Sequence, residues 1–167
     1  VSGAFDKSLM ERFQKNIGKK DSMLNLVSTA YRASDAFLKN NDRNDIGALI
    51  IAGGWIEALY FAAQTAKASN NQEIINRIAE QKNTLANLVG LMETYAGSEE
   101  YSELISQLKG LQTDFESIEY KYIYDKPTTD EAKKTTTFTS KSEVKITPEQ
   151  LKSITEKIES LRKLVVG

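Results

Sequence analysis

The stretch Gly53-Gly54-Trp55-Ile56-Glu57 combines the residue types in this chain that are best suited to hold a ligand. Glu57 is the only charged residue of the segment 46–63, and a carboxylate in apolar surroundings must be ion-paired, hydrogen-bonded or protonated. Trp55 and Tyr60 could form the walls of a small pocket, with Glu57 as its polar anchor. A candidate ligand-binding site is therefore predicted at Gly53, Gly54, Trp55, Glu57 and Tyr60.

The two glycines also have a purely structural interpretation. A glycine inside a helix costs about 1 kcal/mol relative to alanine, so some feature must offset that cost. Close approach of a neighbouring helix would do so, and a kink is a second explanation. Small residues that would help the approach surround the glycines: Gly47, Ala48, Ala52, Ala58 and Ala62. We favour packing over a pocket, and we expect an Arg, Lys or amide partner for Glu57.

The chain lacks the residues that most catalytic mechanisms require. The chain has no cysteine and no histidine, which removes thiol nucleophiles, imidazole bases and zinc sites. One carboxylate without a second at helical spacing cannot support glycosidase chemistry. Asp42, Asn44 and Asp45 resemble the start of a calcium loop, but the remaining ligands and their spacing are missing. No glycine-rich phosphate loop occurs. We expect no enzyme activity, no metal and no cofactor.

Composition favours one water-soluble domain. The chain has 167 residues, of which 40% are hydrophobic and 27% charged, values that are typical of a globular protein. Its formal net charge is -1, from 22 basic and 23 acidic side chains. A nucleic-acid-binding protein would normally carry a basic excess, and so would a polybasic membrane-surface protein. We therefore expect neither, and we treat residues 1–167 as a single domain.

The segment that carries the candidate site is predicted to be the central helix of this domain. It spans approximately residues 45–69, and its apolar residues lie on all sides between 46 and 66. Such a helix is either buried in a bundle or placed in a membrane. Glu57 near its middle, three internal glycines and the lack of a Lys/Arg bias between its flanks favour burial in the bundle.

One-sided apolar patterns predict the other helices. A short one over 5–17 ends at Gly18, and a second begins with Asp21 as its cap. Beyond the central helix, heptad spacing predicts a helix from Asn70-Asn71 to Gly97 and another that Ser98 caps. Their short connection indicates that these two helices pack antiparallel. The last helix begins with Thr147 as its cap, Pro148 at its first position and Gln150 three residues after the cap.

A loop and extended arm are predicted over 125–147, before the last helix. Phe138, Val144 and Ile146 share one parity in an alternating pattern, which is typical of a strand. The segment 120–124 also alternates, with Tyr120, Tyr122 and Tyr124 on one parity, and could be the partner strand. We slightly favour the alternative in which the preceding helix continues through Tyr122. These tyrosines could stack a ligand, although aromatics at helix ends are more often the edges of a core.

Three stretches give the chain a resemblance to a known family. They are residues 53–60 (GGWIEALY), residues 77–82 (RIAEQK), and the tail that contains 134–137 (KTTT) and 143–147 (EVKIT). In this order they resemble lipoproteins of Bacteroides-type bacteria that have no assigned activity. The resemblance implies export to the periplasm or cell envelope, a lipid anchor and helices upstream of this sequence, and attachment to the membrane only through that anchor. It supplies no catalytic residues.

Together these patterns predict an all-α fold. We expect a bundle of about five or six helices with a central apolar helix and a short extended or β arm before the last helix. The predicted function is that of a non-enzymatic helical interaction or structural protein of the bacterial cell envelope. It would bind a protein partner or a second copy of itself. The alternative is a small-ligand-binding or sensory bundle with a pocket near Gly54, Trp55 and Glu57.

Overall fold

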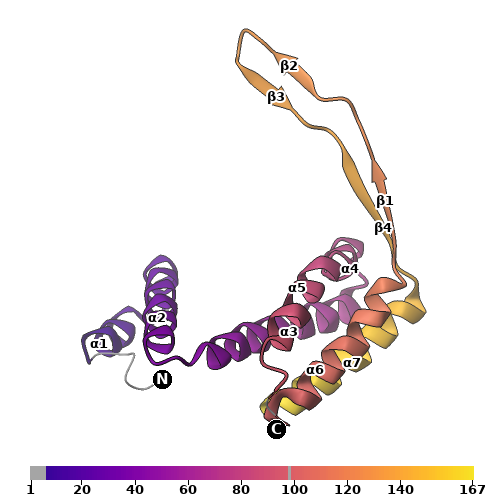
Figure 1. Ribbon diagram of the computed structural model, residues 1–167. Coiled ribbons are helices and arrows are strands. Elements are labelled where there is room, and N and C mark those ends of the chain that lie inside the picture. The colour runs from indigo at the N-terminus through magenta and orange to yellow at the C-terminus, as the bar shows by residue number, and fades with distance from the viewer. Residues whose placement is uncertain (1–6, 98) are drawn as a thin grey trace. The chain divides into compact units, whose positions relative to one another are not determined.

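The computed structural model describes residues 7–97 and 99–167 and is mostly helical, with a β arm before the last helix (Figure 1). This confirms the predicted fold class in its main features. The chain divides into two compact units, Val1–Ile51 and Ala52–Gly167, and the division falls inside one continuous helix, α3 (Asn44–Ser69). That residues 1–167 form a single domain stays a prediction.

The first unit contains α1 (Lys7–Asn16), α2 (Lys20–Asn40) and the beginning of α3. Gly18 ends the first helix as predicted, with a φ of +86° that favours glycine. The expected cap is wrong, because Lys19 occupies the cap position of α2 and makes no side-chain cap bond, while Asp21 lies in the first helical turn. Phe5, the first residue of the predicted pattern, lies outside the described residues.

The second unit continues with α4 (Gln72–Ala79), α5 (Lys82–Glu93), α6 (Glu99–Glu116) and α7 (Pro148–Val166). Its core contains the largest fully buried side chains of the described chain: Ile56, Ile78, Leu85, Met92, Leu108, Leu111, Phe115, Ile154, Ile158 and Leu161. These residues come from five helices and follow the three- and four-residue spacing of helices that pack along their length. Apolar periodicity therefore determines which face of each helix is buried.

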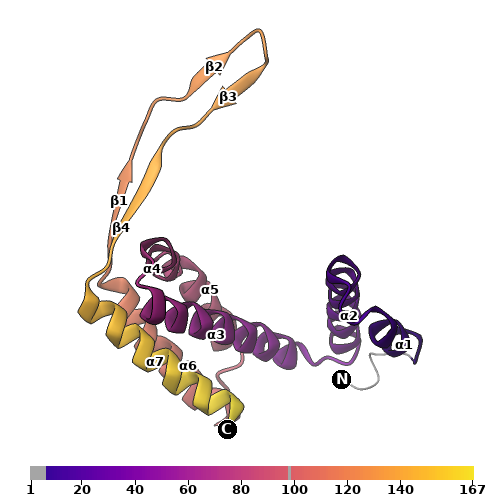
Figure 2. The same cartoon turned by 180° about the vertical axis from the view of Figure 1, so that it is seen from behind.

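Antiparallel packing of α5 on α6 is confirmed by contacts between the two helices. Lys82 at the start of α5 reaches the backbone carbonyl of Glu116 at the end of α6, and Glu93 at the end of α5 pairs with Lys109 in the middle of α6. Both views show α6 and α7 side by side (Figures 1 and 2). The predicted cap of α6, Ser98, lies outside the described residues.

The single helix predicted from Asn71 to Gly97 is two helices. Asn71 caps α4 as expected, and its side chain accepts hydrogen bonds from the backbone N–H groups of Glu73 and Ile74. The helix stops at Ala79, whose carbonyl accepts a hydrogen bond from the hydroxyl of Tyr120. A carbonyl that is bound from outside does not need a partner in the next helical turn, so this contact helps the helix to end there.

The preference for a helix through Tyr122 is also wrong. α6 ends at Glu116, and Glu119–Ile123 forms strand β1, which pairs antiparallel with β4 (Lys141–Lys145). Further out, β2 (Thr128–Asp130) pairs with β3 (Thr135–Thr137). The arm therefore comprises residues 119–145 and begins six residues earlier than predicted. The start of α7 is confirmed, because Thr147 and Gln150 form a reciprocal capping box with Pro148 at the first helical position.

The helix α3 is less buried than a central helix should be. By length and composition it could cross a membrane, but one face packs into the core through Ala52, Ile56, Leu59, Ala63 and Ala66. We call these residues the inner seam. The side chain of Phe61, on another face, is 59% exposed. The expectation of burial on all sides is therefore wrong, since α3 has a buried face and an exposed one.

Candidate functional site

Glu57 has the partner that the sequence requires of it. Nε and Nη2 of Arg162, on α7, donate hydrogen bonds of 2.7 and 3.1 Å to the two carboxylate oxygens of Glu57. The same guanidinium lies 4.5 Å from the centre of the Tyr60 ring, in a cation–π contact. One turn further along α3, Gln64 donates a 2.7 Å hydrogen bond to Glu159 of α7. These residues form a polar contact line between α3 and α7.

This geometry indicates that Glu57 and Tyr60 join two helices. The carboxylate is doubly bound by Arg162, a planar arrangement that fixes both side chains. The hydrogen bond from Arg162 lowers the pKa of Glu57 below its usual value of 4.5 and so keeps the carboxylate ionised. A general acid would need the opposite shift.

The lowered pKa of Glu57 gives a pH-dependent prediction for Glu57→Gln. A carboxyl group whose folded-state pKa is depressed stabilises the fold above pH 4.5, and this contribution is lost as the pH falls through the folded-state pKa. We expect Glu57→Gln to be less stable than the wild type at pH 7 and the difference to shrink steadily below pH 4.5. Urea unfolding of both proteins across this range measures the difference. A stability gap that stays constant down to about pH 3 would contradict the pairing.

Trp55 lies on a different side of α3. Its Nε1 donates a 3.3 Å hydrogen bond to the side-chain oxygen of Gln81, in the turn between α4 and α5. Beside it is a hollow of about 180 Å³, lined by Trp55, Ala58, Leu59, Ala62, Arg77, Ile78 and Gln81. Neither Glu57 nor Tyr60 lines this hollow, so the structure does not bring the predicted walls and anchor together. Its volume lies below the roughly 300–1,000 Å³ of typical ligand pockets.

Packing within this chain does not explain why Gly53 and Gly54 are glycines. A Cβ on Gly53 would meet Val165 of α7 at 3.9 Å, an ordinary contact distance, and a Cβ on Gly54 would meet no atom within 4 Å. α3 also continues through both positions without interruption. The favoured interpretation, a close helix approach that requires both glycines, is therefore wrong for the contacts within this chain. The small residues that do pack closely are alanines of the inner seam.

A larger groove lies between α3 and α7. Its volume is about 380 Å³, and its lining includes Ala63, Leu151 and Thr155 on the floor, with Lys67, Lys152, Glu156 and Glu159 around them. The mixed charges of these side chains give the groove no strong preference for an anion or a cation. No local sequence pattern predicts this groove, because its two walls are more than 80 residues apart in the chain.

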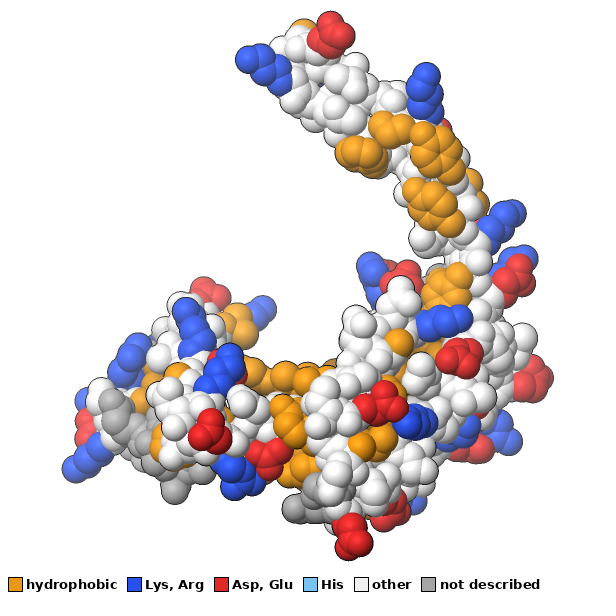
Figure 3. Space-filling model, viewed as in Figure 1, with side chains coloured by type: hydrophobic (Ala, Val, Ile, Leu, Met, Phe, Trp, Pro, Cys, Tyr) orange, Lys and Arg blue, Asp and Glu red, His pale blue; other side chains and the backbone are white. Residues whose placement is uncertain are grey.

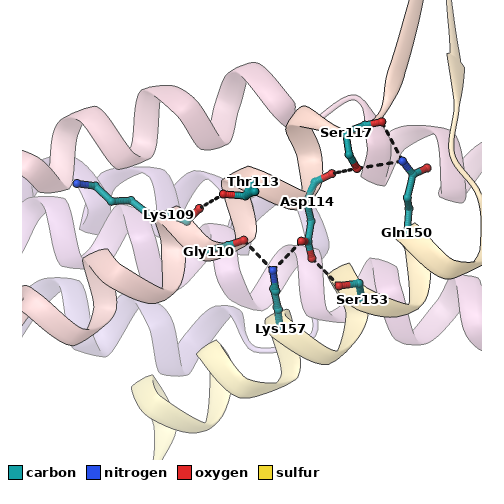
Figure 4. Close-up of polar contacts among 8 residues, drawn as sticks. All are labelled: Lys109, Gly110, Thr113, Asp114, Ser117, Gln150, Ser153 and Lys157. Carbon is teal, nitrogen blue, oxygen red and sulfur yellow. Dashed lines mark hydrogen bonds and ion pairs between the residues drawn. The ribbon is translucent and has the colours of Figure 1, made fainter.

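The polar cluster between α6 and α7 brings a hydroxyl, a carboxylate and an amine together (Figure 4). Ser153 donates a 2.7 Å hydrogen bond to one carboxylate oxygen of Asp114, and Lys157 binds the other at 2.6 Å. Lys157 also donates to the backbone carbonyl of Gly110. We call Asp114, Ser153 and Lys157 the α6–α7 clasp. A nucleophile next to a base has this geometry in hydrolases, but none of the hollows described above is lined by these three side chains.

The arm carries the most exposed aromatic side chains of the second unit. The exposed fractions are 65% for Tyr122, 68% for Tyr124 and 75% for Phe138. In the space-filling view, hydrophobic side chains gather on the arm between its base and its tip (Figure 3). Tyr120 is different, because its hydroxyl is bound to Ala79 and its ring lies 5.1 Å from the amine of Lys82. Tyr120 thus fixes the base of the arm to the helices and leaves the other aromatics free.

The two faces of the inner arm differ in chemistry. In the β1–β4 register, Glu119 lies opposite Lys145 and Lys121 opposite Glu143, whereas Tyr122 lies opposite Ser142. Because side chains alternate along a strand, the charged pairs occupy one face and the tyrosines the other. Opposite charges across strands stabilise the pairing by about 0.2–1 kcal/mol each. The face of Tyr120 and Tyr122 is thus an aromatic and hydroxyl face.

An extra residue interrupts the arm halfway. Four residues, 124–127, connect β1 to β2, but only three, 138–140, connect β3 to β4. Asp125 holds this irregular region together: its carboxylate accepts a 2.6 Å bond from Thr139, and its backbone bonds to Ser140. The sequence signal for this pairing is the alternation of Tyr120, Tyr122 and Tyr124.

Other candidate chemistry is not assembled in the described part of the chain. Between residues 7 and 97 and from 99 onward, no group of three or more acidic side chains is placed to hold a metal ion. Asp45, from the calcium-like stretch, is bound by the guanidinium of Arg43. No family model, curated protein or solved structure matches the chain. Its function must therefore be argued from its own surfaces.

Proposed function

We propose that this chain is a non-enzymatic interaction protein that binds a protein partner through the exposed aromatic side chains of its arm. The observation that carries the proposal is the exposure of Tyr122, Tyr124 and Phe138 on one slender hairpin. Exposed aromatic clusters are costly in water and are enriched at the centres of protein interfaces. Nothing in the packing of the helices requires these rings.

The partner would bind the exposed aromatic side chains and not the strand edges. Lys121, Lys141 and Lys145 lie on the paired strands, and lysines on a free edge discourage the addition of another strand. Tyrosine suits this role because its ring gives a large contact area and its hydroxyl can bond to the partner or to water. The resemblance to exported lipoproteins supports a place in the periplasm or cell envelope, with membrane attachment through an upstream lipid anchor.

Site-specific cross-linking tests the proposal. With a photoreactive phenylalanine analogue in place of Tyr124, we expect one discrete cross-linked partner in cells. The same analogue in place of Tyr31, an exposed tyrosine on α2, is the matched control and should give no such product. The triple variant Tyr122→Ser, Tyr124→Ser, Phe138→Ser should bind the identified partner at least about tenfold more weakly with an unchanged melting temperature. Equal binding by the triple variant would exclude the arm as the interaction surface.

A small-ligand-binding function remains the second candidate, because the groove between α3 and α7 has the volume of a ligand pocket. It would be located away from the predicted Gly53, Gly54, Trp55, Glu57 and Tyr60 site, since none of these residues lines it. A compound that binds there should raise the melting temperature of the wild type and of Glu57→Gln alike. A shift that Glu57→Gln abolishes would instead support the site predicted from the sequence.

A further inference from the structure

The exposed face of α3 has a regular pattern. Between residues 54 and 65, the exposed residues of this helix are Gly54, Ala58, Phe61 and Thr65. Their spacing of four, three and four places them in one row along the helix, as in a helix–helix contact. We call this row the outer seam. It lies on a different side of α3 from the inner seam, whose spacing follows the same rule.

A contact at the outer seam would explain why residue 54 is a glycine. Glycine in the interior of a helix is destabilising, yet the space around a Cβ at Gly54 is empty within 4 Å. Phe61, two turns further along the same row, exposes 59% of its side chain. A vacant position and a projecting ring on one seam are the two halves of a knob-into-hole contact.

We propose that the outer seam is the contact face between two copies of this chain, with their α3 helices antiparallel about a two-fold axis that passes between Glu57 and Ala58. In this register Phe61 of each copy lies over Gly54 of the other, and the two Ala58 residues lie next to the axis. A parallel arrangement would place ring against ring and glycine against glycine, which leaves a clash and a void. A two-fold contact must be self-complementary, and the antiparallel register meets that condition.

Charge is compatible with this pairing. The outer seam contains no ionisable side chain, so two copies can approach without burying a charge. The nearest carboxylate on the helix, Glu57, is already bound by Arg162 within its own chain. Small residues at the crossing point allow the two backbones to come close, which increases the contact per residue. The outer seam and the arm share no residue. An experiment that disproves the contact between two copies would therefore not affect the proposed function of the arm.

The contact should be weak. Four residues per copy form an interface at or below the lower end of the size range of stable complexes. We therefore expect a dimer with a dissociation constant of about 1–100 µM, detectable by sedimentation velocity over about 5–500 µM protein. A wild-type chain that stays monomeric over this range would overturn the proposal.

Filling the vacant position tests the contact directly. Gly54→Leu adds a side chain where nothing obstructs it in the monomer, so its melting temperature should not fall, but it removes the space for Phe61 of the second copy. We expect at least a tenfold weaker dimer. Gly90→Leu is the matched control, since Gly90 is also exposed inside a helix with no atom within 4 Å of a Cβ. Dimers weakened equally by both substitutions, or by neither, would contradict the contact.

Single cysteines test the orientation, and the chain contains no natural cysteine that could interfere. Ala58→Cys lies next to the two-fold axis, close to its copy, and should form a disulfide-linked dimer on oxidation, because disulfides require Cα atoms about 4.4–6.8 Å apart. Thr65→Cys would be distant from its copy in an antiparallel pair and should remain a monomer. Rapid cross-linking of Thr65→Cys, or none of Ala58→Cys, would overturn the antiparallel arrangement even if a dimer exists.

Discussion

Phe115→Ala should destabilise the second unit by about 3–5 kcal/mol, the usual cost of truncating a buried phenylalanine. The side chain of Phe115 is fully buried on α6, in the same core as Leu85 and Ile158. Its removal loses the transfer free energy of the ring and leaves a cavity that rigid helices cannot close. Natural domains are stable by only about 5–15 kcal/mol in total, so this single substitution removes a large share of the free energy of unfolding.

Urea unfolding followed by far-ultraviolet circular dichroism measures this loss. Phe138→Ala is the matched control, because the same atoms are removed from a ring that is 75% exposed. We expect that variant to stay within about 0.5 kcal/mol of the wild type, as surface substitutions usually do. Similar losses from both substitutions would mean that the ring of Phe138 is buried in solution, and the assignment of the arm as a free surface would then be wrong.

Asp114→Ala should cost about 1–3 kcal/mol, through the α6–α7 clasp. The carboxylate is the shared acceptor for Ser153 and Lys157, so its removal leaves a hydroxyl and an ammonium group partly buried without their main partner. An unsatisfied donor costs more than the hydrogen bond itself contributes. We therefore expect a larger effect than that of Ser153→Ala, which deletes one donor and leaves the ion pair intact.

A double-mutant cycle of Asp114→Ala and Ser153→Ala checks this assignment. The two losses should be less than additive, because both substitutions remove the same hydrogen bond. Additive losses would show that the two side chains act independently. If Asp114→Ala folded as stably as the wild type, the cluster would not be a structural clasp, and its resemblance to a nucleophile–base pair would need a functional explanation.

Periodicity and capping residues predicted most of the helices, because each of these signals is local. Gly18, Asn71 and the Thr147–Gln150 capping box act within a few residues of their own helix ends. The two misplaced boundaries depend on distant partners. Ala79 is bound by Tyr120, 41 residues away, and the end of α6 is bound by the side chain of Gln150, which donates to the carbonyl of Ser117 across 33 residues. No local pattern contains such contacts.

The candidate site also has features that follow from local sequence and features that depend on distant residues. The need of Glu57 for a partner could be derived from the apolar composition around it, but the identity of that partner, Arg162, is set by how α7 packs on α3. The separation of Trp55 from Glu57 follows from their positions on different sides of the helix. The sequence marks Gly54 as unusual for a helix interior, but no local pattern shows that the space beside it within this chain is empty.

The contact between Ser117 and Gln150 affects how the sequence and length of the arm can vary. The arm leaves the bundle just after Ser117 and returns just before Gln150, and these two residues touch through a 2.9 Å hydrogen bond. Entry and exit therefore coincide, and the arm is placed like an insertion between the packed helices α6 and α7. Insertions of this kind can lengthen, shorten or exchange their surface while the helices below keep their packing. The surface of the arm and the packing of the helices can then change separately in the same chain.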